Sequence, residues 1–406
     1  MSTTLEHRLD EHCRHTVLGL RSALLELYHS VEADITRPQE VARRFGLNKN
    51  LTWKIARILQ AQDALEAVPL IPGSTGLEIL LEAMGNAGAP IAAVERVRAM
   101  ALEFDRMIES HADDRAGFEL LLDSMGGSRP LEIGRKLAFR GNTAIWGLQA
   151  RVRLTAQFLA PNAQDPSLLD IALVCGLLGV RRLRPVQRWP LFRFARYNDD
   201  ASPLGTSTNV EPLEPSAAEK KLPWLMSSWC SPPYPPLERV NRADDEVHEL
   251  TDGPIGRTGE FSCMFGFVER GTVPRYADEQ NRTGEPASAI TLPIETLLFD
   301  LFVHRSLLEA RRPELCVYGR PSGTLSLDPD LRVRQLLPFS ERLVELGGSP
   351  PQVATPLVPG YEKLVATAFE RAGWNPRDFF ASRLVLEYPP MPSTVVLRYE
   401  LPERPR

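Results

Sequence analysis

The chain has 406 residues, of which 43% are hydrophobic and 24% charged, and its formal net charge is −5. This length allows two or three domains, and the ordinary balance of apolar and charged residues excludes wholesale disorder. The five cysteines are scattered without a CxxC pair, and no apolar run is as long as a bilayer span. The start, MSTTLEHRLDEH, is polar. We therefore expect a cytoplasmic protein without a secretory signal or a membrane partner.

Basic residues are concentrated in two stretches of this acidic chain. Residues 36–60 hold six Lys or Arg and one acid, a net charge of +5, and residues 129–196 carry a net charge of +9. Basic zones on an otherwise acidic chain are typical of nucleic-acid contact. An uneven but solvated surface explains the second zone equally well.

The first 127 residues predict an all-α domain. Apolar residues recur at three- and four-residue spacing in 5–30, and shorter helices are indicated at 77–84 and 114–125. The most regular pattern lies in 90–110, where the apolar residues of an a/d seam step by 3, 4, 3 and 4: Val94, Val97, Ala101, Phe104 and Ile108. The seam predicts self-association through residues 90–110, or else packing of this helix inside its own domain.

Beyond these helices the periodicity changes to that of strands. Apolar residues alternate with mostly polar ones in 144–154, and 170–178 is a short apolar run. A helix remains an alternative for the first of these, because Ile145, Leu148, Val152 and Leu159 also share a helical face. Residues 187–196 are expected to pair with the apolar run 170–178. Residues 260–268, EFSCMFGFV, predict a further strand.

The last third of the chain predicts two helices and a hairpin. Residues 293–310 have the pattern of an amphipathic helix with Pro293 in its first turn, and 361–372 predict a helix that stops at Gly373. At the end, 384–388 and 395–401 both alternate, with PPMPS between them. This pattern predicts a terminal β-hairpin.

Residues 36–60, TRPQEVARRFGLNKNLTWKIARILQ, have the pattern of two helices joined by a tight turn. Thr36 and Gln39 have the spacing of a capping box, so the first helix is expected to begin near Arg37. Gly46 can adopt the left-handed conformation that ends a helix, and Asn48 is a good cap for the next one.

The sequence of the second helix predicts one apolar face, its back, and one polar face, its front. Its buried face is expected to hold Leu51, Ile55, Ile58 and Leu59. Lys49, Asn50, Trp53, Arg57 and Gln60 are left on the outer faces. A recognition helix needs this division, because its back holds it to the domain while its front offers donors to a DNA groove.

This stretch resembles the helix-turn-helix of bacterial transcriptional regulators, in the broad winged-helix sense, over 25 of the 406 residues. The resemblance implies that seven residues face duplex DNA: Arg43, Arg44, Lys49, Asn50, Trp53, Lys54 and Arg57. The two arginines of the first helix are expected at phosphates, and the other five on the face that the second helix turns toward the DNA. Trp53 departs from the small or polar residue usual there, and 61–73 predict no β-wing.

These patterns together predict an α+β protein. An all-α N-terminal helix-turn-helix domain (1–127) is followed by a mixed α/β C-terminal region. That region is expected to comprise a basic α/β segment (128–198), a Pro- and Ser-rich linker or long loop (199–237) and an α+β domain (238–406).

The function expected from this organisation is transcription regulation. The N-terminal domain would bind duplex DNA, and the C-terminal region would sense a partner or a small-molecule effector whose identity the sequence does not give. The alternative is a structural or assembly protein that uses its helix-turn-helix unit for protein–protein contacts. The two hypotheses differ in whether the basic face and Arg57 must be exposed.

Three other groups of residues have simpler explanations than a site. His7, His12, Cys13 and His15 are close enough in sequence to bind a metal, but a polar helix face accounts for them. Asp300 and His304 fit a local i, i+4 pair on a helix. The Arg- and aromatic-rich run 181–196 fits a half-buried strand. Since no catalytic motif is found, we expect no enzyme activity, no cofactor and no metal.

Overall fold

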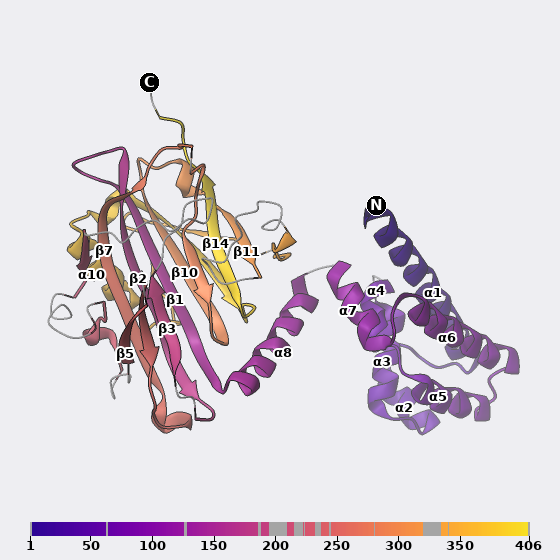
Figure 1. Ribbon diagram of the computed structural model, residues 1–406. Coiled ribbons are helices and arrows are strands. Elements are labelled where there is room, and N and C mark those ends of the chain that lie inside the picture. The colour runs from indigo at the N-terminus through magenta and orange to yellow at the C-terminus, as the bar shows by residue number, and fades with distance from the viewer. Residues whose placement is uncertain are drawn as a thin grey trace. The chain divides into compact units, whose positions relative to one another are not determined.

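The computed structural model describes residues 2–61, 64–125, 128–185, 188–194, 209–214, 222, 224–231, 237–242, 245–279, 281–319, 334–339 and 341–404. The chain divides into two compact units, Met1–Leu131 and Glu132–Arg406. The described part of the first unit is helical, and the second is built mainly of β-strands. The protein is therefore α+β, with helices mainly in the N-terminal part and a large sheet in the C-terminal part (Figure 1).

The N-terminal unit confirms the helices expected from the apolar spacing. Its elements are α1 (Ser2–Ser30), α2 (Pro38–Phe45), α3 (Lys49–Gln60), α4 (Ala64–Ala67), a 3₁₀ turn (Val68–Leu70), α5 (Ser74–Asn86), α6 (Ile91–His111) and α7 (Arg115–Met125). The next helix, α8 (Ser128–Trp146), runs into the second unit.

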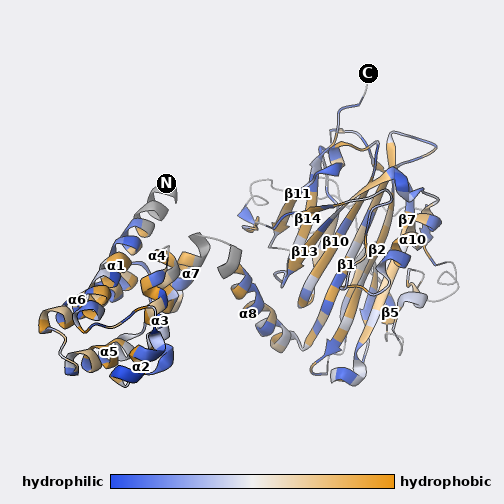
Figure 2. Ribbon diagram, turned by 180° about the vertical axis from the view of Figure 1, so that it is seen from behind, coloured by the Kyte–Doolittle hydropathy of each residue, from blue (hydrophilic) through white to orange (hydrophobic). Residues whose placement is uncertain are grey.

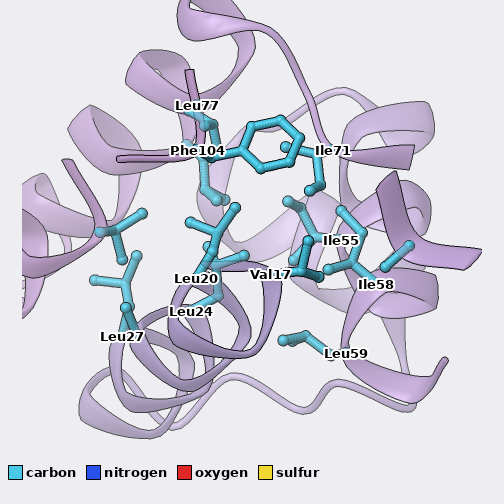
Figure 3. Packing of buried hydrophobic residues seen from close by; sticks show 14 of the residues in the cluster. Val17, Leu20, Leu24, Leu27, Ile55, Ile58, Leu59, Ile71, Leu77 and Phe104 are labelled. Carbon is cyan, nitrogen blue, oxygen red and sulfur yellow. The ribbon is translucent and has the colours of Figure 1, made fainter. Parts of the chain in front are cut away.

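One apolar core holds the N-terminal helices together. Val17 and Leu20 of α1, Ile55 and Ile58 of α3 and Phe104 of α6 all belong to it, and each is at most 2% exposed. Figure 3 shows these side chains meeting in the interior of the unit. Burial of large side chains like these stabilises a domain by about 1.5–3 kcal/mol each, so the core fixes how α3 is held.

The a/d seam of 90–110 lies in this core. Val97 and Phe104 are 0% and 2% exposed, and α6 packs along α1. Packing inside the domain, the second of the two alternatives for this seam, therefore accounts for its burial. Self-association of this helix would have to use its exposed residues, such as Ile91 and Leu102.

The C-terminal unit is built around a seven-stranded sheet with strand order β12-β13-β10-β1-β2-β7-β4. Its strands are β1 (Leu148–Pro161), β2 (Leu168–Arg182), β4 (Val210–Pro212), β7 (Phe261–Pro274), β10 (Ile294–His304), β12 (Val344–Leu346) and β13 (Phe379–Glu387). Strands β1 and β10 are parallel and the other neighbours antiparallel. Figure 1 shows the four long strands β10, β1, β2 and β7 side by side.

Both faces of this sheet are covered. Helix α10 (Tyr361–Ala372) packs on one face, where Phe369 meets the stacked rings of Phe158 and Phe302 edge-on. Two smaller sheets share the core of the other face. Their strands are β3 (Trp189–Phe194), β5 (Leu237–Arg242), β6 (Asp245–Leu250), β8 (Thr283–Gly284), β9 (Ala287–Ile290), β11 (Glu314–Tyr318) and β14 (Ser393–Glu400).

Several expected elements of this unit are confirmed. Strands occupy most of 144–154, all of 170–178 and residues 261–268 of the predicted 260–268, although residues up to Trp146 belong to α8. Helix α10 ends at Ala372 with Gly373 in the left-handed conformation, as the sequence predicts. Strands 384–388 and 395–401 are also largely present as β13 and β14.

The helix predicted for 293–310 is wrong, because 294–304 form strand β10, which lies between β13 and β1 in the large sheet. Both faces of β10 are buried and seven of its eleven residues are apolar, and a short, mostly apolar run of this kind fits a helix or a strand. The predicted contact between Asp300 and His304 on one face of a helix is therefore also wrong. Four residues along a strand span about 13 Å, which is too far for the two side chains to share a proton or a metal.

Two predicted pairings are also wrong. Strands β13 and β14 form no hairpin: β13 pairs with β10 and β12, whereas β14 pairs with β8, β9 and β11 in another sheet. Strand β3 pairs with β6 and not with β2. Alternation along a strand indicates which side chains face a core, but it does not select the neighbouring strand.

The segments into which 128–406 was predicted to divide do not form separate units, because the large sheet takes strands from all of them. Strand β2 from the 128–198 segment pairs with β7 from the 238–406 domain, so one sheet spans both. Within the predicted linker 199–237, β4 adds an edge strand to that sheet by pairing with β7, and Ser227–Trp229 form a 3₁₀ turn. The other residues of that linker lie largely outside the described ranges.

Candidate nucleic-acid interface

The turn between α2 and α3 follows from two residues. Gly46 has φ +64° and ψ +26°, in the left-handed region that glycine adopts without a steric penalty, and its N–H donates to the carbonyl of Ala42. The side-chain oxygen of Asn48 accepts a hydrogen bond from the Asn50 N–H at 2.8 Å. The predicted end of the first helix and cap of the second are thus both confirmed.

The predicted capping box at the start of α2 is wrong. Helix α2 begins at Pro38, and the N-cap Arg37 makes no side-chain cap bond. Instead, Thr36 donates to Asp34 through its backbone N–H at 2.8 Å and its hydroxyl at 2.7 Å. The hydroxyl bond, followed by the backbone bond and the nearby Arg37 charge, lowers the pKa of Asp34. A proline at the first helical position needs no N–H partner, so the box is dispensable.

The front and back of α3 are sharply divided. Thr52, Ile55, Ala56, Ile58 and Leu59 are buried, and Leu51 is half-buried. The exposed residues are Lys49, Asn50, Trp53, Lys54, Arg57 and Gln60. Every residue that the sequence assigned to the front of this helix is therefore exposed, on a helix whose back is anchored in the core.

The two arginines of α2 differ in how they are held. Arg43 and Arg44 are both exposed. The Nη1 of Arg44 donates to the backbone carbonyl of Glu32 at 2.9 Å, and its guanidinium lies over the Phe45 ring. Arg44, in the last turn of α2, is thus tied to the segment between α1 and α2, whereas the described residues give Arg43 no hydrogen-bond acceptor. Figure 2 shows α2 as a largely hydrophilic helix.

Trp53 and Arg57 are in contact on the front of α3. The Cζ atom of Arg57 lies 4.9 Å from the centroid of the Trp53 ring, and Trp53 is 52% exposed. Sequence reasoning named both residues but did not join them, although their i, i+4 spacing places them on adjacent turns.

In the Arg- and aromatic-rich run 181–196, the described residues include the end of β2 and the whole of β3, and two of the arginines form ion pairs. Arg181 forms an ion pair with Glu260 at 2.7 Å, and Arg188 contacts Glu238 at 3.0 Å and Glu249 at 3.4 Å. Arg182 is buried and donates to the carbonyl of Thr251. These pairs occupy guanidinium groups that a nucleic acid would need.

His12 and Cys13, near the start of α1, lie in different surroundings, and the side chain of His7 is outside the part of the chain that the structure describes. Cys13 is buried in the core, whereas the His12 Nδ1 lies 3.1 Å from the Nε2 of His111. Desolvation, and then the His12 charge, lowers the pKa of His111. Among the residues that the structure describes, no three His, Cys, Asp or Glu side chains form a group suited to a metal ion.

No strand follows α3 in the described residues of the N-terminal unit, which continue as α4, a 3₁₀ turn and α5. No helix in the described part of the chain is both long and apolar enough to cross a membrane. No protein-family model matches the chain, and a search of curated proteins finds no relative.

Proposed function

We propose that the protein is a transcriptional regulator that binds duplex DNA through a helix-turn-helix formed by α2 and α3. The division of α3 carries this proposal: an apolar back lies in the core, while Lys49, Asn50, Trp53, Lys54 and Arg57 are exposed together. A helix anchored in this way can enter a major groove without rearranging its domain. The separate C-terminal unit would sense the effector or partner.

The charges of α2 and α3 support phosphate contact. Arg43, Lys49, Lys54 and Arg57 are exposed, and the described residues provide no acidic partner for any of them. The one acid in 36–60, Glu40, lies 3.4 Å from Arg37. This surface therefore keeps its positive charge available to the DNA backbone.

The test is binding of the full chain to a labelled pool of random duplexes at several salt concentrations. Each phosphate neutralised lowers the slope of log K against log salt by about 0.9, so four contacts give a slope near −4. Lys54→Glu should weaken DNA binding. Arg106→Glu makes the same change of charge at an exposed position of α6 and should not weaken it. Absence of binding at low salt would contradict the proposal.

One observation favours assembly as a second candidate. Trp53 is a large, half-exposed ring beside an arginine, and these residue types are enriched in protein–protein hot spots. In that case Trp53→Ala would change the oligomeric state in sedimentation experiments, and no duplex would be bound.

A further inference from the structure

Trp53 and Arg57 occupy the middle of the exposed face of α3. Successive residues of an α-helix are about 100° apart, so both side chains point directly away from the buried side formed by Ile55 and Leu59. They are flanked on one side by Lys49 and Gln60 and on the other by Asn50 and Lys54. Any surface that α3 approaches front-on meets this pair first.

The contact between the two side chains orients the guanidinium of Arg57. Its Cζ lies 4.9 Å from the ring centroid, within the range of a cation–π interaction. Such a contact uses the flat face of the guanidinium, whereas the N–H donors lie in its plane and point outward. The ring therefore restricts the arginine while leaving its hydrogen-bonding edge available, which reduces the entropy lost on binding.

Other arginines of this unit use their donors within the protein. Arg98 pairs with Glu78 and Glu95, Arg37 with Asp34 and Glu40, and Arg115 with Glu119. Arg57 is held in place by Trp53, but no described residue accepts a hydrogen bond from it. An arginine that is oriented in this way and keeps its donors available can donate hydrogen bonds to a binding partner.

We infer that Arg57 and Trp53 together read a guanine next to a pyrimidine that carries a C5-methyl group. This inference rests on the proposed DNA binding. Guanine offers two acceptors in the major groove, O6 and N7, which match the two donors of a guanidinium edge. The exposed edge of the Trp53 ring would contact the methyl group of the neighbouring base, as apolar side chains do with thymine.

Thymine and 5-methylcytosine present the same methyl group, so the experiment must separate them. The full chain is first used to select sequences from a random duplex pool, and we expect the selected sites to contain guanine next to thymine. Defined duplexes of a selected site then carry single changes at that step: 7-deazaguanine, which lacks N7, uracil, which lacks the methyl group, or a 5-methylcytosine pair.

The expected changes in Kd follow from the contacts removed. Loss of the N7 acceptor should weaken binding about tenfold, since a bidentate arginine–guanine pair discriminates by about 1–3 kcal/mol. Loss of one methyl contact should weaken binding about threefold to fourfold. Replacing the thymine pair by a 5-methylcytosine pair should keep the methyl contact, and unmethylated cytosine should lose it.

Variants connect these effects to the two side chains. Arg57→Met keeps a long side chain but has no hydrogen-bond donor, so the 7-deazaguanine penalty should disappear. Trp53→Ala should abolish the uracil penalty. Lys54→Ala is the matched control, because Lys54 is exposed on the same helix: binding to all duplexes should weaken while the ratios between duplexes stay the same.

The outcomes separate this inference from the proposed function. If selected duplexes bind but neither base analogue changes Kd, the inference is wrong and DNA binding stands. The same holds if Arg57→Met and Trp53→Ala leave the analogue ratios unchanged. If no duplex binds at low salt, both the inference and the proposed function are wrong.

Discussion

Arg383 on β13 forms two hydrogen bonds with Asp300, the residue directly opposite it on β10. Its Nε donates to Oδ1 at 2.8 Å and its Nη2 to Oδ2 at 2.7 Å, and Nη2 also donates to the carbonyl of Val353 at 2.7 Å. Asp300 is completely buried. This pair therefore joins the two strands and the segment before α10 at a place where a single charge would be very costly.

Arg383→Met should destabilise the C-terminal unit strongly, because it leaves the carboxyl group of Asp300 buried without its partner. We expect the free energy of unfolding to fall by about 3–5 kcal/mol in urea denaturation. Arg398→Met is the control: Arg398 is 40% exposed and lies 3.6 Å from Glu285, so its removal should cost at most about 1 kcal/mol. Equal effects of the two variants would contradict this account.

Arg57→Ala and Arg43→Ala should differ in their effect on DNA binding. Replacing Arg57, on the front of α3, should cost about 1–3 kcal/mol of binding free energy on the preferred sequence and reduce discrimination between sequences. Replacing Arg43, on α2, should weaken binding to all sequences about equally and reduce the salt slope by about one. Both side chains are exposed, so thermal melting should not change. If Arg57→Ala melts early and binds DNA normally, Arg57 has a structural role.

Phe104→Glu and Leu102→Glu test whether α6 mediates self-association. Phe104 is 2% exposed, so a charge there should unfold the N-terminal unit, with a loss of at least about 3 kcal/mol. Leu102 is 51% exposed, and its substitution should leave the unit folded. If residues 90–110 join two copies, Leu102→Glu lowers the mass seen in sedimentation; an unchanged mass would count against that contact.

Asp34 should make the N-terminal unit sensitive to acid. Its folded pKa lies below that of the unfolded chain, so its stabilising effect is present above the unfolded pKa of 3.8 and is lost as pH falls through the folded value. The melting temperature of Asp34→Asn should therefore lie below that of the parent at pH 6, and the difference should shrink below pH 4. Equal melting temperatures of the two proteins at pH 6 would contradict this account.

The candidate interface was predictable because local rules determine it. Gly46 ends one helix and Asn48 caps the next, and both effects involve only a few neighbouring residues. The back of α3 follows from apolar spacing alone. The contact of Arg57 with Trp53 was also within reach of the sequence, because residues four apart on a helix are neighbours.

The arrangement of strands in the β-rich unit could not be predicted in the same way, because it depends on contacts between residues far apart in the sequence. Apolar segments such as 170–178 and 260–268 were recognisable as strands, but their order in the sheet was not. Residues 294–304 lie in a strand that α10 covers on one face and the smaller sheets cover on the other. Both faces are therefore mostly apolar, and the alternation that would have indicated a strand is lost. Asp300 is tolerated there only because Arg383, 83 residues away, lies opposite it.

The sequence by itself determined the turn between α2 and α3 and which residues of α3 face outward, since caps and helical periodicity act over a few residues. Only the tertiary structure decided which strands are neighbours and that the 90–110 seam belongs to the core of its own unit. The physical reason is that a strand satisfies its backbone hydrogen bonds with another strand, and an apolar face can be buried by any matching surface.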